Sequence, residues 1–360
     1  MCDAVYVVDP RRAEGPMMRV AIVHDYLTQR GGAERVVLSM HRIWPDAPIF
    51  TSIYDPKGTF PELAECDVRA TVLTHIPNAG KFVRALLPVY PAAFRTIDLR
   101  AYDLVVSSTT AWAHGVRTPN ATHVTYCNNP ARWLYRTDTY LAEGGAVPSS
   151  AAPLLAPLFA ALRRWDQAAA KRPDVYVSNS KSVAARVMAA YGRTSEIVHP
   201  PVDTGRMRRL VSNAHHASVP SGPFWLVVGR MLPYKRIDVA VEAAARAGTR
   251  LVAVGDGPTR SHLESIGGPG LEIRSGISDD ELGALYNACI GLVLPGEEDF
   301  GIVPLEANAV GKPVVAFGRG GALETVIDGR TGVLVPSQDP DDFGAAMAAA
   351  ATRSWDADVL

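Results

Sequence analysis

The stretch GLVLPGEEDFGIVPLEANAVG, residues 291–311, contains a strand, a loop and a helix in that order. Residues 291–294 are short and apolar, which is typical of a strand buried on both faces. Residues 302–310 follow as a helix with Pro304 in its first turn, where the missing N–H of proline costs no hydrogen bond. A strand, loop and helix in this order are the repeating unit of a parallel α/β sheet.

The same alternation extends in both directions along the chain. It predicts strands over 19–24, 104–107, 122–126, 175–177, 197–199, 224–228, 251–254, 271–274, 313–316 and 332–335, and helices over 33–40, 161–171, 181–190, 237–247, 260–266, 279–288 and 340–351. The fold class is therefore α/β, with two doubly wound Rossmann-like domains. We expect an N-terminal extension (1–18), a first domain (19–203), a linker (204–222), a second domain (223–351) and a C-terminal tail (352–360).

Composition excludes several classes of protein. The 360 residues, 48% hydrophobic and 20% charged, suit two globular domains and not a disordered chain. No apolar run approaches the ~18 residues that cross a bilayer, and residues 1–17 lack the apolar core of a secretory signal. The four cysteines form no C-x-x-C pair for zinc or dithiol chemistry. A reduced, cytoplasmic protein fits best.

Charge is distributed unevenly along the chain. Residues 1–210 carry 25 Lys and Arg against 18 Asp and Glu, a net charge of +7, whereas residues 211–360 carry 11 against 19, a net charge of -8. The basic part is expected to face something anionic. Nucleic acid is not the expected partner, because the chain has no zinc finger, RNA-recognition signature or basic helical stripe.

Ligands of doubly wound sheets bind beyond the carboxyl ends of the strands, so the loops after residues 228, 294 and 316 are the candidate site. The first loop, 229–235, begins with Gly229 and carries Arg230 and Lys235, a forked donor and a point charge that could both reach a diphosphate. Two solvated surface cations are the alternative. The glycine-rich third loop, 317–321, is either a backbone approach to a ligand or a flexible turn, and GDGP at 255–258 is similarly ambiguous.

The second loop, 295–301, leads into the helix that begins near residue 302. Glu298 precedes the helix and Glu306 lies about one turn inside it. Carboxylates only accept hydrogen bonds, so the pair suits the O–H donors of sugar hydroxyls. The N–H groups of Phe300, Gly301, Ile302 and Val303 form an end that binds anions or hydroxyls. In the alternative interpretation, Glu298 only complements the helix dipole and Glu306 is solvated.

The order GR-x4-K (229–235), GDGP and E-x7-E (298–306) resembles the donor-nucleotide half of family 4 retaining glycosyltransferases of the GT-B fold. HDYLTQRGGAERV (24–36) and VHPPVDT (198–204) are similar to the same family, especially its bacterial mannosyltransferase-like members. The resemblance implies two domains facing each other across a cleft. It implies that Arg230 and Lys235 neutralise the donor diphosphate, Glu306 binds ribose, and Glu298 holds the transferred sugar. Donor contacts are also implied for Gly31, Gly32, Gly229, Ile277 and the N–H groups of 300–303.

The expected reaction needs no metal or other cofactor. Two cations can stabilise the charge that develops on the departing phosphate, and the one D-x-D, at 356–358, lies in the terminal tail. No second carboxylate is placed for a double displacement, so the resemblance implies front-face attack. The family often has a histidine where this chain has Asn128, which cannot be a general base. His24, Asp25, Asn128 and Arg132 are the acceptor-side candidates.

The expected partners are a nucleoside diphosphate hexose, with GDP-mannose favoured by the resemblance, and a glycan or lipid-linked acceptor. Residues 81–100 mix basic residues with apolar ones and fit either contact with an anionic membrane, at the inner face of the plasma membrane, or core packing with solvated charges. Two other functions remain open: a sugar-nucleotide epimerase or hydrolase, and a catalytically silent sugar-nucleotide sensor. A dehydrogenase is disfavoured because no G-x-G-x-x-G follows the first strand.

Overall fold

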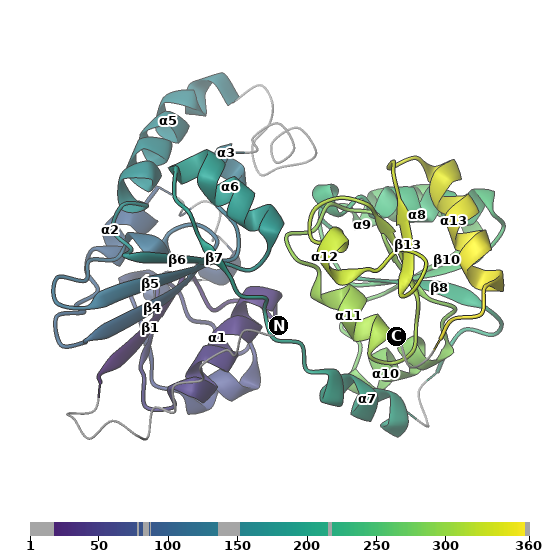
Figure 1. The fold of residues 1–360 in the computed structure, drawn as a ribbon, viewed down its shortest axis with the longest axis horizontal. Coiled ribbons are helices and arrows are strands. Elements are labelled where there is room, and N and C mark those ends of the chain that lie inside the picture. Colours follow the sequence, from purple (N-terminus) through teal and green to yellow (C-terminus); the bar gives the residue numbers. More distant parts are fainter. Residues whose placement is uncertain are drawn as a thin grey trace, which may run out of the picture.

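A computed structural model describes residues 18–77, 79–81, 86, 88–135, 152–214 and 218–356. Figure 1 shows two α/β domains side by side, each built on a parallel sheet with helices packed around it. The chain passes between them once within the described residues, after β7 (Glu196–Ile197) and into α7 (Thr204–Asn213).

The N-terminal sheet has seven parallel strands in the order β3-β2-β1-β4-β5-β6-β7. All five residues of β1 are buried, as expected for the strand at which the winding direction reverses. The other strands are β2 (Ile49–Thr51), β3 (Val68–Ala70), β4 (Leu104–Thr109), β5 (Thr122–Cys127) and β6 (Val175–Ser178), and β1 itself is Val20–His24.

The C-terminal sheet has six parallel strands in the order β10-β9-β8-β11-β12-β13. This is the doubly wound order in which the strand succession reverses between β8 and β11, so the loops after these strands flank the usual ligand position. The predicted fold class is confirmed. The strands are β8 (Phe224–Val228), β9 (Arg250–Val254), β10 (Leu271–Arg274), β11 (Leu292–Leu294), β12 (Val314–Phe317) and β13 (Gly332–Val335).

Helices cover the faces of both sheets (Figure 1). In the N-terminal domain they are α1 (Gly32–Ile43), α2 (Tyr90–Phe94), α3 (Arg132–Tyr135), α5 (Ala152–Ala169) and α6 (Lys181–Tyr191). In the C-terminal domain they are α8 (Ile237–Arg246), α9 (Arg260–Ile266), α10 (Asp279–Ala288), α11 (Ile302–Asn308), α12 (Ala322–Thr325) and α13 (Pro340–Thr352). Short 3-10 helices are η2 (Pro61–Glu65), η3 (Val72–His75), η4 (Ala79–Lys81), η5 (Ala113–Gly115), η7 (Pro233–Lys235) and η8 (Gly268–Gly270).

Helix α7 lies within the segment expected to be a linker, and its packing places it in the C-terminal domain. The Asp203 side chain caps it by accepting a hydrogen bond from the Arg206 N–H at 2.7 Å. Met207 is 1% exposed and packs in an apolar cluster with Phe224 and Leu285. The second domain therefore begins near residue 204, because the amphipathic helix needs an apolar surface to cover it. The predicted boundary at 223 is corrected accordingly.

Strands β2 and β3 have no counterpart among the strands predicted from sequence. Each has three residues, and β3 carries the exposed Arg69 and Ala70, so neither shows a long apolar run or a clear alternation. β2 pairs with the edge of β1, and β3 pairs with the edge that β2 then provides, because each edge offers backbone hydrogen-bonding groups that a short segment can satisfy.

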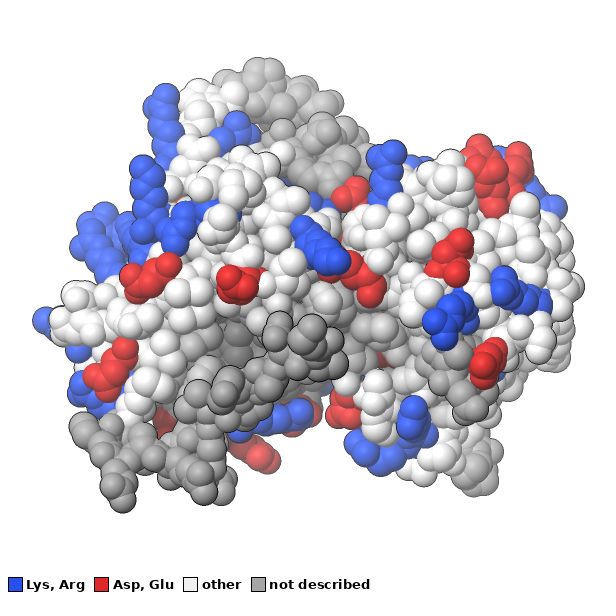
Figure 2. Space-filling model, in the orientation of Figure 1, with Lys and Arg blue, Asp and Glu red and all other residues white. Residues whose placement is uncertain are grey.

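The basic and apolar segment considered for membrane contact is only partly described. Residues 82–85 and 87 lie outside the described residues. Tyr90 and Phe94 are fully buried in the N-terminal core, which supports the packing alternative for these two side chains. Among the described helices, none combines the length and apolarity needed to cross a bilayer. In Figure 2, Lys and Arg side chains gather on the upper left, the α5 side of the N-terminal domain.

Candidate functional site

Residues 29–35, after β1, lie against the C-terminal domain. The Arg230 guanidinium donates to Gln29 Oε1 at 2.8 Å, and Arg35 Nη1 donates to Glu306 Oε1 at 3.2 Å. A Cβ on Gly32 would lie 3.3 Å from Ile302 Cδ1. Three of the predicted donor-site residues therefore meet one short segment of the opposite domain.

Lys235 and Glu298 form an ion pair within the C-terminal domain. The Lys235 ammonium donates to Glu298 Oε1, and the two side chains are only 20% and 12% exposed. Burial lowers the pKa of Lys235, but the charge and hydrogen bond of Glu298 and the nearby Tyr234 together outweigh burial, so the pKa lies above its ordinary value. Lys235 is therefore charged at neutral pH, and the first and second candidate loops share one site.

Glycines allow the first and second loops to approach closely. A Cβ on Gly296 would lie 2.7 Å from Lys235 Cα, and one on Gly255 would lie 1.9 Å from the carbonyl oxygen of Gly229. A Cβ on Gly257 would lie 2.3 Å from the Met231 carbonyl oxygen. The GDGP segment thus supports the backbone of the loop that carries Arg230.

The third loop supports the acidic second loop. The Gly321 N–H donates to the carbonyl oxygen of Glu298 at 2.9 Å. A Cβ on Gly320 would lie 2.4 Å from this oxygen, and one on Gly321 would lie 2.2 Å from the Phe300 carbonyl oxygen. These glycines are needed for contact between two protein loops. The sequence had suggested either a backbone approach to a ligand or a flexible turn.

Glu306, the predicted ribose-binding group, is nearly buried. Its side chain is 10% exposed and lies on the inner side of α11, facing Arg35 of α1. Burial raises the pKa of Glu306, and the positive charge of Arg35 opposes this rise. A cation from the other domain thus favours the ionised form of this buried carboxylate.

The remaining donor-side residues occupy distinct surroundings. The Phe300 ring stacks on His199 with 4.8 Å between ring centroids and 25° between ring planes. Gly301 precedes α11 with φ +89°, a left-handed conformation that favours glycine. Val303 and Ile277 pack against the apolar core of the C-terminal domain. Their predicted donor contacts stay predictions.

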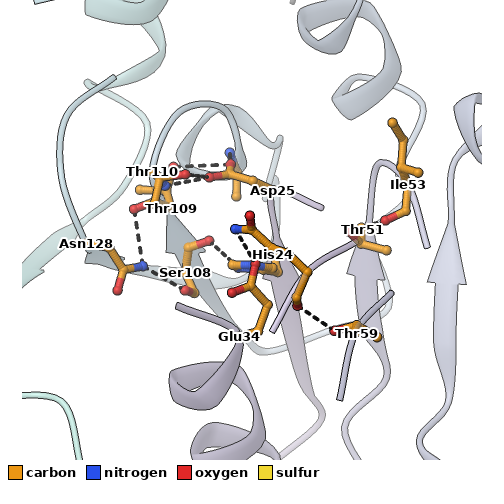
Figure 3. A network of polar contacts seen from close by, with 12 residues as sticks. His24, Asp25, Glu34, Thr51, Ile53, Thr59, Ser108, Thr109, Thr110 and Asn128 are labelled. Atoms are coloured by element: carbon orange, nitrogen blue, oxygen red, sulfur yellow. Dashed lines mark hydrogen bonds and ion pairs between the residues drawn. The ribbon is translucent and has the colours of Figure 1, made fainter. Parts of the chain in front are cut away.

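His24 and Asp25 belong to a buried polar network (Figure 3). His24 Nδ1 donates to the Ser108 carbonyl oxygen at 3.0 Å, and its Nε2 lies 3.7 Å from Glu34 Oε1. Asp25 accepts hydrogen bonds from the backbone N–H groups of residues 110–113 at 2.5–3.0 Å. Both side chains are at most 2% exposed. These hydrogen bonds join the end of β1 to the loop after β4. The predicted acceptor-side role of the two residues stays a prediction.

Asn128 and Arg132 also have protein partners. Asn128 Nδ2 donates to Ser108 Oγ at 3.0 Å and to the Thr109 carbonyl oxygen at 3.4 Å (Figure 3), which joins the ends of β4 and β5. Arg132 donates to Asp299 Oδ1 at 2.5 Å and lies over the Tyr234 ring, 4.2 Å from its centroid. The side chain predicted to take an acidic group of the acceptor instead binds an acidic side chain of the other domain.

Several residues at this junction escaped the sequence analysis. Arg35 directly follows Gly32, Ala33 and Glu34 in a quoted motif, and Asp299 lies beside Glu298, so both could have been found by adjacency. Arg186 had no signal, since it is one basic residue on an amphipathic helix. The further contacts are Arg186 with Glu297 and Asp299, Ser180 with the Asp299 carbonyl, and Glu324 with His199 and the N–H groups of Lys181 and Ser182.

Two protein-family descriptions match consecutive parts of this chain. "Glycosyltransferase Family 4" matches residues 30–206, and "Glycosyl transferases group 1" matches residues 222–353. Together they include every described strand except β1 and every candidate loop of the C-terminal domain. The chain belongs to the family 4 glycosyltransferases.

Curated relatives of this glycosyltransferase family match over part of their length. A D-inositol 3-phosphate glycosyltransferase of Catenulispora acidiphila is 35% identical over 201 residues, 49% of this chain and 47% of that protein. One of Streptomyces bingchenggensis is 34% identical over 199 residues, 47% of this chain and 43% of that protein. The chain thus spans slightly less than half of the length of these relatives.

Solved structures confirm the GT-B fold. Anabaena HepE in complex with UDP and glucose has a TM-score of 0.63 at 18% identity, with 92% of this chain and 89% of that chain covered. Sucrose-phosphate synthase of Thermosynechococcus elongatus has a TM-score of 0.62 at 19% identity, with the same coverage. Metal independence stays a prediction; the described part of the glycosyltransferase contains no group of three His, Cys, Asp or Glu side chains that could hold a metal ion.

Proposed function

We propose that this chain transfers a hexosyl group from a nucleoside diphosphate sugar to a hydroxyl acceptor, with retention of anomeric configuration. The observation that carries the proposal is the ion pair of Lys235 and Glu298 where the loops of both sheets meet. Arg230 and Glu306 border the same junction through their contacts with residues 29–35. Family membership adds an independent argument for this chemistry.

The charges at the junction suit the breaking of a bond between a sugar and a diphosphate. Negative charge develops on the leaving phosphate, and fixed cations stabilise it more strongly in the transition state than in the ground state. In the proposed complex, Arg230 and Lys235 bind the diphosphate. Glu298 accepts hydrogen bonds from hydroxyls of the transferred sugar, and Glu306 accepts them from the ribose diol.

Each of these groups already has a partner within the protein. Lys235 binds Glu298, Arg35 binds Glu306, and Arg230 binds Gln29. The donor must therefore replace these contacts. A charged diphosphate can do so because phosphate oxygens form charge-assisted hydrogen bonds with both cations, while sugar hydroxyls satisfy the released carboxylates.

Retention through a protein nucleophile would require a carboxylate free to attack the sugar. Two further carboxylates, Glu297 and Asp299, flank Glu298 along the chain, and both bind Arg186. Burial raises the pKa of Asp299, but Arg132 and Arg186 outweigh burial and hold it below its ordinary value. A carboxylate held in this way is a poor nucleophile, which favours front-face attack assisted by the departing phosphate.

Donor and acceptor identity are the finer part of the proposal. The resemblance to mannosyltransferase-like members favours GDP-mannose, whereas the structural neighbour HepE is a complex with UDP and glucose. The names of the curated relatives make D-inositol 3-phosphate a further acceptor candidate beside a glycan or a lipid-linked sugar. A lipid-linked acceptor would place the enzyme at an anionic membrane surface.

The deciding experiment follows the release of GDP or UDP from a panel of donors, with and without these acceptors. The reaction is expected to depend on an acceptor and to give a product with the anomeric configuration of the donor by NMR. Lys235→Met should lower kcat by about 100- to 1000-fold, since one preorganised donor to the leaving group is lost. Arg246→Ala is the matched control, because this exposed arginine binds Glu242 and Asp341 on the C-terminal domain.

Other outcomes identify the alternative functions. Release of nucleoside diphosphate that is independent of every acceptor would favour a hydrolase, and conversion of the donor sugar without release would favour an epimerase. Donor binding by calorimetry without turnover would favour a silent sensor. Inversion of the anomeric centre would contradict the front-face mechanism.

A further inference from the structure

Asp299 is held by the opposite domain at three points. Its Oδ1 accepts hydrogen bonds from Arg132 at 2.5 Å and from Arg186. Its backbone carbonyl accepts one from Ser180 Oγ at 2.6 Å. The carboxylate is 26% exposed, and the two guanidinium groups are 17% and 19% exposed. This contact between the domains is thus largely removed from solvent screening.

The two arginines also contact the neighbours of the proposed catalytic pair. Arg132 lies over the ring of Tyr234, the residue before Lys235. Arg186 binds Glu297 at 2.7 Å, so together with Asp299 it holds both residues that flank Glu298. The N-terminal domain therefore contacts residues next to Lys235 and next to Glu298. These contacts leave the ion pair between Lys235 and Glu298 intact.

The two arginines lie on helices that follow neighbouring strands. Arg132 begins α3 after β5, and Arg186 lies on α6 after β6, the strand next to β5. Arg186 also donates to Asn129 Oδ1 at 3.3 Å, and Asn179 Nδ2 donates to the Asn128 carbonyl oxygen at 3.0 Å. Arg132 and Arg186 are thus linked to one another through the Asn128–Asn129 loop.

We propose that Arg132, Arg186 and Asp299, named here the arginine clasp, are positioning residues that align Lys235 and Glu298 when the two domains meet. The inference rests on the proposed transferase function and adds the means by which domain contact orders the reacting groups. Donor binding relies on Arg230, Lys235 and the two glutamates of the C-terminal domain. Catalysis additionally requires the loop geometry that the clasp imposes, because small displacements at a reacting centre are costly.

The test compares Asp299→Asn with Glu272→Gln. Glu272 is a matched control, since its carboxylate binds Arg274 at 2.6 Å within β10 and has no contact described with the other domain. In Asp299→Asn, kcat should fall about 10- to 100-fold, while the dissociation constant for the donor, measured by calorimetry, changes less than threefold. Asp299→Glu should recover part of kcat. The control should retain the kcat of the original chain.

Small-angle scattering of the ligand-free proteins supplies a readout independent of turnover. Asp299→Asn should have a larger radius of gyration than the original chain and the control, because the junction has lost its central charge. An unchanged radius together with unchanged kcat would overturn the clasp. A lower melting temperature with unchanged kcat would also overturn it, because the three residues would then contribute only to stability. If the original chain transfers no sugar from any donor, the proposed function fails, and the scattering comparison still decides whether Asp299 holds the domains together.

Discussion

Substitution of Gly321 tests the close contact between the third loop (317–321) and the second loop (295–301), which carries Glu298. It precedes α12 with φ -66° and ψ -19°, a conformation that any residue adopts, so Gly321→Ala adds no backbone strain. The new Cβ would lie 2.2–2.4 Å from three backbone atoms of Phe300, whereas ordinary contact begins near 3.4 Å. Backbone cannot rotate away as a side chain can, so the two loops must separate.

The required separation is more than 1 Å at Phe300, two residues from Glu298. Overpacking of this kind costs about 1–3 kcal/mol of unfolding free energy. In a domain of this size the melting temperature of the C-terminal domain should fall by roughly 3–9 °C. A misplacement of about 1 Å near a reacting centre can lower kcat about 100-fold. The loss of activity should therefore exceed what the loss of folded protein explains at 25 °C.

Gly318→Ala is the matched control in the same loop. Its Cβ would lie 3.3 Å from the Val335 carbonyl oxygen, a contact that shifts of a few tenths of an ångström relieve. Thermal melts, donor affinity by calorimetry and kcat are measured for both variants. Equal melting temperatures and equal kcat for the two variants would refute the loop contact and, with it, the placement of Glu298.

Two further predictions concern buried charge. On acidification, donor affinity should be lost at a pH above 4.5, because burial raises the pKa of Glu306 from that ordinary value. Arg35→Gln should move the pH at which calorimetry detects half of this loss still higher. An unchanged midpoint pH in this variant would contradict the pairing of Arg35 with Glu306. Burial lowers the pKa of His24, but Glu34, Asp25 and the Ser108 carbonyl together outweigh burial and raise it. The resulting stabilisation is present below pH ~6.5 and lost as pH rises; Glu34→Gln should flatten this slope in thermal melts.

The parallel sheets could be predicted because their central strands are continuous apolar runs. β1, β8 and β11 are buried on both faces, which leaves few residue types possible and makes them visible in one sequence. The edge strand β3 is different, since its exposed residues tolerate any polar side chain. Helix α7 could be recognised as a helix only through the apolar surface that Met207 covers, and that surface belongs to residues far along the chain.

The candidate site could be predicted where chemistry is concentrated in short motifs. Lys235 and Glu298 lie on the loops after β8 and β11, which are neighbouring strands of one sheet. Loops at the same end of neighbouring strands lie close together, so both residues could be assigned to one site. The partners Arg35 and Arg186 come from the other domain, and no local pattern encodes a contact across more than 100 positions. Arg132 and Asp25 bind protein groups in the structure, which the sequence alone does not distinguish from a ligand, and their acceptor-side roles stay predictions.

Part of the uneven charge of the chain is matched across the junction. The basic N-terminal half was expected to face something anionic, and the described ion pairs between the domains all join its cations to acids of the C-terminal half. They are Arg35 with Glu306, Arg132 with Asp299, and Arg186 with Glu297 and Asp299. An anionic donor entering here meets carboxylates that are already neutralised by the opposite domain. The domain contact thereby reduces the electrostatic repulsion that the acidic half would otherwise exert on a diphosphate. The ion pairs that join the domains therefore also favour the approach of an anionic donor.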